Sequence, residues 1–178
     1  PEAWLVGGSY VVFGKASGFS SRLDLSSLNG SNGFRLDGVD ALDYSGRSVS
    51  SAGDVNGDGF DDVIIGANGG DPDGKDRAGE SYVVFGKSSG FSSSLDLSSL
   101  DGSNGFRLDG VDQSDQSGYS VSSAGDVNGD GYDDVIIGAY YADPDGKSNA
   151  GESYVVFGKS SGFSSSLDLS SLDGSNGF

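Results

Sequence analysis

Two nine-residue segments carry the side chains of this sequence that are best suited to chemistry. Residues 54–62 read DVNGDGFDD and residues 126–134 read DVNGDGYDD. Each segment has oxygen-bearing side chains at positions 1, 3 and 5, glycine at position 6 and a carboxylate at position 9. Alternate residues of such a loop point inward and the glycine permits a sharp turn, so the loop can wrap a hard cation. The side chains concerned are Asp54, Asn56, Asp58 and Asp62 in the first segment, and Asp126, Asn128, Asp130 and Asp134 in the second.

Position 7 of each segment completes the set of oxygen ligands. It is Phe60 in one copy and Tyr132 in the other, and each can offer its backbone carbonyl oxygen. Ca²⁺ takes about six to eight oxygen ligands, a number that the loop and one water can supply. An EF-hand would require Glu at position 12, where this sequence has Ile65 and Ile137. We therefore predict Ca²⁺ as the cofactor, held in a loop between two strands.

The alternative to a metal site is an Asp/Asn/Gly turn that merely tolerates left-handed backbone. Four carboxylates within nine residues would repel one another strongly without a cation. The pattern also occurs twice with the same spacing. Both features favour the metal site over the plain turn.

The overall composition excludes several other classes of function. The formal charge is −17, from 27 acidic and 10 basic residues, which argues against binding to nucleic acid or to an anionic membrane surface. The chain has no Cys and no His, which excludes disulfides, a thiol nucleophile, the usual zinc sites and His-based acid–base catalysis. No stretch approaches the roughly 20 apolar residues of a membrane-spanning helix, so we expect no membrane insertion.

The sequence is an internal repeat with an offset of 72 residues. Residues 9–80 and 81–152 are identical at 59 of 72 aligned positions, and residues 153–178 match residues 81–106 at all 26 positions. We divide the chain into an N-terminal flank (1–8), two full units (9–80 and 81–152) and a partial unit (153–178). Because residues 153–178 also match residues 9–34 at 23 of 26 positions, the two ends would compete for one place in a ring. We therefore expect a window of a longer array.

Each unit contains the signals of four short strands. We predict strands at Gly105–Asp109, Ser120–Asp126, Asp134–Ala139 and Ser153–Phe157, where apolar and β-branched residues alternate or cluster between glycines. The loop Ser88–Asn104 is rich in Ser, Gly and Asp, and we expect Leu95, Leu97 and Leu100 to anchor it to a neighbouring element. Four short strands, repeated, are typical of β-propeller blades. The predicted fold is therefore all-β, with propeller blades of four antiparallel strands in tandem 72-residue repeats.

The loop D-x-N-x-D-G-x-x-D, followed by D-V-I-I-G-A and a G-x-x-Y-V-V-F strand, resembles the FG-GAP repeat of integrin α-subunit propellers and their bacterial relatives. The resemblance implies a β-propeller with calcium in hairpin loops on one face, and a role in adhesion or surface recognition. The sequence departs from the family pattern at two points. The "FG" position reads Ser-Gly at residues 45–46 and 117–118, and the "GAP" position reads Gly-Ala-Asn at 66–68 and Gly-Ala-Tyr at 138–140.

Three further features have plainer interpretations. The Asp-Pro-Asp-Gly-Lys segments at 71–75 and 143–147 are predicted turns. The aspartates Asp37, Asp40 and Asp43, with their copies one repeat later, are expected to form a solvated rim. Tyr140 and Tyr141 replace Asn and Gly of the other unit, which indicates either a contact surface or a difference in packing.

We predict that the chain is not an enzyme. Adjacent carboxylates such as Asp61 and Asp62 point to opposite faces of a strand, and no base accompanies the many serines. We expect an extracellular or cell-surface module for adhesion, in which calcium stiffens a propeller that binds a protein or glycan ligand. The alternative is a structural repeat protein that self-associates into an extracellular filament, sheath or matrix.

Overall fold

The chain folds as an all-β structure of three sheets. The computed structural model describes residues 6–178, and residues 1–5 of the N-terminal flank lie outside the described part. Strands are joined by loops that contain five short 3₁₀ turns: η1 (Leu25–Ser27), η2 (Pro72–Gly74), η3 (Leu97–Ser99), η4 (Pro144–Gly146) and η5 (Leu169–Ser171). Within residues 6–178, no helix has the length and apolar character needed to cross a bilayer.

The central sheet is a complete blade. Its strand order is β11-β7-β5-β4-β3, with β3 (Ser48–Gly53), β4 (Asp62–Ala67), β5 (Glu80–Val84) and β7 (Gly105–Asp109) paired antiparallel. The short strand β11 (Ser166–Asp168) adds to β7 in parallel. The predicted four-stranded antiparallel blade is confirmed. Its strands come from both units: β3 and β4 belong to the first and β7 to the second, while β5 begins at Glu80, the last residue of the first.

The N-terminal sheet holds the later strands of a blade. It consists of β1 (Gly8–Val12), paired antiparallel with β2 (Gly33–Asp37), and of β6 (Ser94–Asp96), paired in parallel with β2. By the 72-residue offset, β1, β2 and β6 correspond to β5, β7 and β11 of the central sheet. Only one edge of β1 is paired with a described strand.

The C-terminal sheet holds the earlier strands of a blade. Its order is β10-β9-β8, with β8 (Ser120–Gly125), β9 (Asp134–Ala139) and β10 (Glu152–Val156) paired antiparallel. A single bridge from Val156 to Gly177 marks the place of a fourth strand on β10. This sheet therefore repeats the β3–β4–β5 part of the central sheet.

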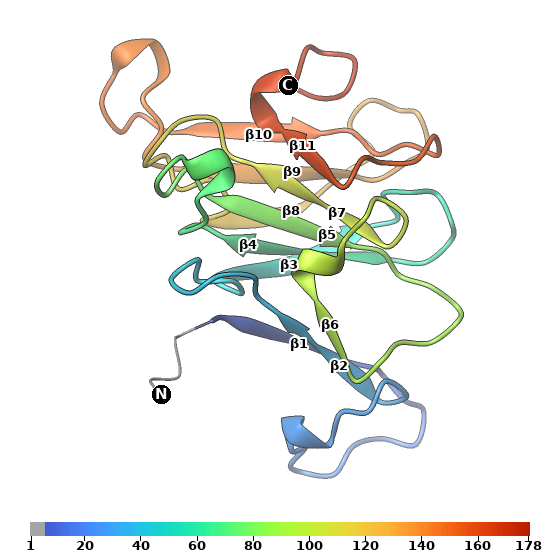
Figure 1. The fold of residues 1–178 in the computed structure, drawn as a ribbon. Coiled ribbons are helices and arrows are strands. Elements are labelled where there is room, and N and C mark those ends of the chain that lie inside the picture. The colour runs from blue at the N-terminus through green and yellow to red at the C-terminus, as the bar shows by residue number, and fades with distance from the viewer. Residues whose placement is uncertain (1–5) are drawn as a thin grey trace.

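The three sheets follow one another face to face from the N-terminal to the C-terminal end (Figure 1). Two hydrophobic cores lie between them. One core joins the central and C-terminal sheets and includes Ile64, Phe106 and Ile137, while the other joins the N-terminal and central sheets and includes Phe34, Ile65 and Tyr82. Packing between neighbouring blades, rather than within one sheet, therefore buries most of the apolar side chains.

The Ser-rich linker after β5 packs between the central sheet and the N-terminal sheet. Leu97 and Leu100 are buried in the core between the N-terminal and central sheets, and Leu95 packs against that core. The predicted anchoring is thereby confirmed. The linker also contains the strand β6 and the turn η3, neither of which the sequence analysis expected.

Candidate metal centre

Each predicted metal loop connects two neighbouring strands of a β-hairpin. The first loop joins β3 to β4 and the second joins β8 to β9, with antiparallel pairing on both sides. The loops are thus flanked by strands and not by helices, as the sequence analysis predicted. Gly59 and Gly131, at position 6, have φ angles of 88° and 93°. Only glycine adopts this region readily, so the sharp turn depends on these residues.

In the first loop the side-chain oxygens of positions 1, 3 and 5 turn back toward the loop backbone. Asp54 accepts hydrogen bonds from the N–H groups of Asp58 (3.0 Å) and Gly59 (2.9 Å). Asn56 Oδ1 accepts from the N–H of Asp58 at 2.9 Å. Asp58 Oδ1 accepts from the N–H of Phe60 at 2.9 Å. All three side chains therefore accept hydrogen bonds from the backbone of their own loop.

The second loop repeats this arrangement. Asp126 accepts from the N–H groups of Asp130 (3.0 Å) and Gly131 (2.9 Å). Asn128 accepts from the N–H of Asp130 at 2.9 Å, and Asp130 from the N–H of Tyr132 at 3.0 Å. Two loops 72 residues apart thus share these hydrogen bonds, and the second adds one from the N–H of Gly129 to Asp126 at 2.7 Å.

Position 9 is a buried carboxylate in both loops. Asp62 is 1% exposed and accepts from the N–H groups of Val55 (2.9 Å) and Gly86 (2.8 Å). Asp134 is fully buried and accepts from the N–H groups of Val127 and Gly158, both at 2.9 Å. Asp62 therefore connects the first loop to the segment that follows β5, and Asp134 connects the second loop to the segment that follows β10.

Burial raises the pKa of Asp62 to about 7. The two backbone N–H groups that it accepts from lower this pKa, and the negative charges of Asp58 and Asp54 raise it further. The first loop therefore concentrates negative charge around a carboxylate that is shielded from water. Asp61, the adjacent residue, is exposed and precedes β4, whereas Asp62 is the first residue of that strand.

The structure brings together part of the predicted ligand set. Hydrogen bonds link positions 1, 3 and 5 to one loop, but within residues 6–178 no three Asp or Glu side chains converge closely enough to form a ready metal cage. At position 7, whose carbonyl oxygen is the predicted ligand, the ring of Phe60 is 42% exposed. The ring of Tyr132 instead packs directly on Gly57 of the first loop, where an added Cβ would lie 2.3 Å from a ring carbon.

The role of position 8 was not predicted from the sequence. Asp133 accepts a hydrogen bond from the N–H of Asp54 at 2.9 Å and thereby joins the second loop to the first. The only sequence signal for this contact is the pair of adjacent aspartates that ends each loop. The signal does not identify the partner, because the partner belongs to the neighbouring blade.

A second group of buried charges lies beside β5 and β7. Glu80 is 6% exposed and accepts a hydrogen bond from the hydroxyl of Tyr82, and Arg107 lies 3.6 Å from Glu80 and bonds both oxygens of Asp109. Burial raises the pKa of Glu80, while Tyr82 and Arg107 lower it. Sequence patterns did not indicate this network, since its members come from different strands.

The expected solvated acidic rim is partly wrong. Asp43 and Asp115 are each 6% exposed, and burial raises the pKa of both. The N–H of Asp40 donates to Asp43 Oδ2 at 3.1 Å. This hydrogen bond compensates in part for the burial of Asp43.

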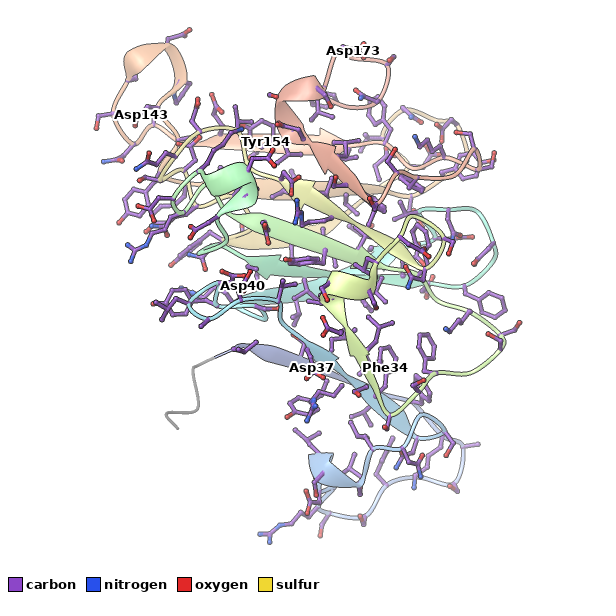
Figure 2. All side chains as sticks on the ribbon, viewed as in Figure 1. Phe34, Asp37, Asp40, Asp143, Tyr154 and Asp173 are labelled. Atoms are coloured by element: carbon purple, nitrogen blue, oxygen red, sulfur yellow. The ribbon has the colours of Figure 1, made fainter. Side chains whose placement is uncertain are left out.

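The Pro-Asp-Gly segments are turns, as predicted. Asp73 and Asp145 adopt left-handed φ angles of 53° and 54° inside η2 and η4. Asp143, at the start of the second of these segments, lies on a loop that projects from the sheets (Figure 2). Neither segment contributes to the metal loops.

Tyr140 and Tyr141 form part of a packed aromatic group. The ring of Tyr140 lies 4.0 Å from that of Tyr141 and 4.3 Å from that of Tyr119. Arg47, from the preceding blade, stacks on Tyr119 and donates a hydrogen bond to its hydroxyl at 2.7 Å. Both tyrosines also remain exposed, at 43% and 38%, so the structure agrees with the contact-surface interpretation as well as with the packing one.

Comparison with known proteins places both loops inside one family of repeats. The model of the FG-GAP repeat family matches residues 45–84 and 117–156, two segments with the 72-residue offset of the internal repeat. Each match begins at the Ser-Gly pair that stands at the "FG" position and includes one metal loop.

Curated relatives point to the same family. The chain is similar to integrin α pat-2 of Caenorhabditis elegans (36% identity over 75% of this chain and 11% of the relative). It is also similar to integrin α-PS2 of Drosophila melanogaster (32% over 79% and 10%) and to integrin α-V of Gallus gallus (31% over 61% and 10%). The chain thus spans about a tenth of the length of these relatives. With two FG-GAP repeats folded as propeller blades, it is an integrin-α-like FG-GAP repeat protein.

Proposed function

We propose that this chain is a calcium-binding β-propeller module that acts outside the cell in adhesion or surface recognition. The observation that carries the proposal is the recurrence of one oxygen arrangement in two loops, formed by Asp54, Asn56, Asp58 and Asp62 and by Asp126, Asn128, Asp130 and Asp134. The backbone carbonyls of Phe60 and Tyr132 complete the ligand sets. Hard oxygen donors in this number suit Ca²⁺ better than a transition metal.

The charge balance of the two loops supports the binding of a cation. No salt bridge among residues 6–178 involves any of the ten proposed ligands. Burying a carboxylate without a cationic partner is costly, and a bound Ca²⁺ would supply the missing positive charge. The carboxylate oxygens proposed as ligands each accept one hydrogen bond and keep a second lone pair for a cation, except Asp126 Oδ1, which accepts from the N–H groups of both Gly129 and Asp130.

Calorimetric titration with CaCl₂ tests the metal site. We expect binding at two loops in the wild-type chain, and a loss of affinity of at least about tenfold when Asp58→Asn and Asp130→Asn are combined. Asp145→Asn is the control for each single substitution, since it removes one charge from an exposed residue whose left-handed backbone suits Asn. Absence of binding heat and of any thermal stabilisation by calcium would contradict the proposal.

The similarity to integrin α subunits supports the proposed adhesive role, and we propose a protein or glycan as the ligand. We propose the buried member of each pair of adjacent carboxylates, Asp62 or Asp134, as a metal ligand, so that an enzymatic role is not needed to explain it. Light scattering with calcium and after chelation separates this role from the structural alternative. A defined particle that keeps its mass in both conditions supports a recognition module. A large assembly that requires calcium would favour an extracellular filament or matrix.

A further inference from the structure

Asn29 differs from the residue at the same position of the other two units. Residues 29–31 read Asn-Gly-Ser, whereas residues 101–103 and 173–175 both read Asp-Gly-Ser. Of the eight asparagines in the sequence, Asn29 alone is followed two residues later by Ser or Thr. The triplet Asn-x-Ser, with any residue but proline in the middle, is the acceptor pattern for an N-linked sugar. The first unit therefore carries one acceptor triplet, and the other units carry none.

The turn that contains Asn29 uses the oxygen of this side chain and leaves its nitrogen free. Asn29 Oδ1 accepts hydrogen bonds from the backbone N–H of Ser31 at 3.0 Å and from its hydroxyl at 2.7 Å. Asp101 Oδ1 accepts the same two bonds from Ser103, at 2.9 Å and 2.6 Å. Asn29 Nδ2 makes no hydrogen bond to any of residues 6–178. Because an aspartate serves the turn equally well, the fold does not account for the amide nitrogen of Asn29.

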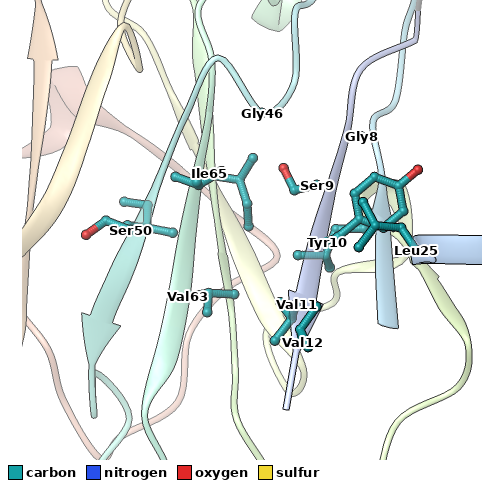
Figure 3. A pocket seen from close by; sticks show the side chains of 13 residues that line it. Gly8, Ser9, Tyr10, Val11, Val12, Leu25, Gly46, Ser50, Val63 and Ile65 are labelled. Atoms are coloured by element: carbon teal, nitrogen blue, oxygen red, sulfur yellow. The ribbon is translucent and has the colours of Figure 1, made fainter. Parts of the chain in front are cut away.

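The side chain of Asn29 is exposed, and this exposure does not depend on the neighbouring sheets. Figure 3 shows Leu25, earlier in the same segment, at a groove of about 540 Å³ beside β1. Leu25 is 42% exposed, whereas its copy Leu97, which packs between two sheets, is 2% exposed. Asp101, by contrast, is exposed just as Asn29 is, although its blade lies between two other sheets (Figure 1). The tip of this turn therefore faces solvent even where sheets lie on both sides of a blade.

The hydrogen bonds of the turn favour the chemistry of such an acceptor. The lone pair of an amide nitrogen is delocalised into the carbonyl group, so an amide is a poor nucleophile until the nitrogen loses a proton. Loss of that proton places negative charge on the amide oxygen, and donors that already point at the oxygen stabilise this charge. The N–H and the hydroxyl of Ser31 are two such donors to Asn29 Oδ1. The folded turn thus supports the oxygen of the amide and leaves its nitrogen open to a reactant.

We propose that Asn29 is the acceptor of an N-linked sugar. In the transfer, Asn29 Nδ2 forms a bond to C1 of a sugar that is carried on a lipid diphosphate. The bond between C1 and the diphosphate oxygen breaks, the diphosphate leaves with the electron pair, and a proton of Nδ2 passes to a basic group of the transferase. The proposal rests on the proposed role outside the cell, since this modification belongs to surface loops of secreted proteins. It gives the first unit a bulky polar substituent that the other units lack.

Mass spectrometry of the 178-residue chain, secreted from cultured eukaryotic cells, tests this assignment. Trypsin releases residues 23–35, a peptide that contains Asn29 and, as an internal control, Asn32, which is followed by Gly-Phe. Peptide N-glycosidase in ¹⁸O-labelled water converts a glycosylated asparagine into a labelled aspartate. The label distinguishes this conversion from earlier spontaneous deamidation of the two Asn-Gly pairs in the peptide. We expect most copies of Asn29, and no copy of Asn32, to carry the label.

Three variants test the separate parts of the acceptor. Asn29→Asp gives the first unit the sequence of the other two and should abolish the label, whereas Ser31→Ala keeps the asparagine, removes the hydroxyl and should remove most of the label. Asp101→Asn creates the same triplet in the same turn of the second unit and should add a second labelled site.

An unlabelled Asn29, equal labelling in Ser31→Ala, or no second label in Asp101→Asn would overturn the assignment of this turn as the acceptor. The calcium titration of Asn29→Asp should match that of the wild type, because Asn29 lies outside both metal loops. A chain that binds calcium and carries no sugar would therefore overturn this inference alone, and a chain that carries the sugar and binds no calcium would overturn the metal site alone.

Discussion

The carboxylate of Asp133 accepts a hydrogen bond from the backbone N–H of Asp54, 79 residues earlier in the chain, at 2.9 Å. The N–H of Asp133 returns a bond to the carbonyl of Asp54 at 3.2 Å. A third bond runs from the N–H of Lys159 to the carbonyl of Val55 at 2.9 Å. Val55 is 1% exposed, whereas its copy Val127 is 51% exposed. The first metal loop is therefore held in place by the following blade.

Asp133→Ala is expected to destabilise the chain. The substitution leaves the partly buried N–H of Asp54 without its acceptor, which costs roughly 1–3 kcal/mol in the free energy of unfolding. Urea denaturation in the presence of a chelator measures this cost without a contribution from metal binding. Asp133→Asn keeps an acceptor oxygen and should recover most of the loss.

Asp61→Ala is the matched control for this prediction. Asp61 occupies the same loop position one repeat earlier, is exposed, and receives no bond from a preceding loop within residues 6–178. Its removal should change the free energy of unfolding by less than about 0.5 kcal/mol. Equal losses for the two alanine variants would show that the contact between the blades contributes nothing specific.

Gly66→Ala is expected to disturb the packing between the central and C-terminal sheets. A Cβ at Gly66 would lie 2.0 Å from the carbonyl oxygen of Gly118 and 2.4 Å from Ser48 Oγ. The first of these atoms is backbone of the next blade and can move only if the blades separate. Overpacking of this kind costs about 1–3 kcal/mol or more, which thermal unfolding would detect.

Gly138→Ala provides the comparison at the same strand position. Its Cβ would meet only Ser120 Oγ at 2.5 Å, with the next atoms at 3.8 Å. A serine side chain can rotate away, so we expect a smaller loss than for Gly66→Ala. A loss as large as that of Gly66→Ala would contradict the view that contact with the next blade decides the cost.

Local sequence patterns were sufficient to predict the blade strands and the loops, but not the contacts between blades. The strands Asp134–Ala139 and Gly105–Asp109 have strong apolar or alternating patterns, and the repeat doubles each signal. The strand β6 has three residues in a Ser-rich linker and exists because it pairs with β2, about 60 residues away. The burial of Asp43 and the role of Asp133 likewise depend on distant segments, which a local pattern does not specify.

The titration of Glu80 is expected to lower the free energy of unfolding as the pH rises. Burial is the largest cause that raises its pKa above the ordinary value of 4.5. The folded state therefore holds this proton more tightly than the unfolded state, and the free energy of unfolding falls as pH rises from about 4.5 through the raised pKa. The groups that face it, in order of effect, are Tyr82, Arg107, Asp43 and Asp109.

Glu80→Gln removes this titration and should flatten the fall in stability relative to the wild type over that pH range. Chemical denaturation in chelator at a series of pH values measures the difference. The ¹³C shift of the Glu80 carboxyl group gives the pKa directly. A measured pKa at or below 4.5 would contradict the prediction.

The two metal loops are expected to bind calcium with different affinities. The first loop is fixed by Asp133 and by the ring of Tyr132, whereas the outward side of the second loop is open, with Val127 exposed. Ordering a segment on binding costs about 0.5–1.5 kcal/mol per immobilised side chain, so the fixed loop should bind roughly threefold to tenfold more tightly. Calorimetry on single variants separates the sites, because Asp130→Asn leaves the first loop intact and Asp58→Asn leaves the second. We expect the tighter remaining site in Asp130→Asn, and we expect Asp133→Ala to reduce the affinity of that site. Equal affinities in the two single variants would show that contact with the following blade does not preorganise the loop.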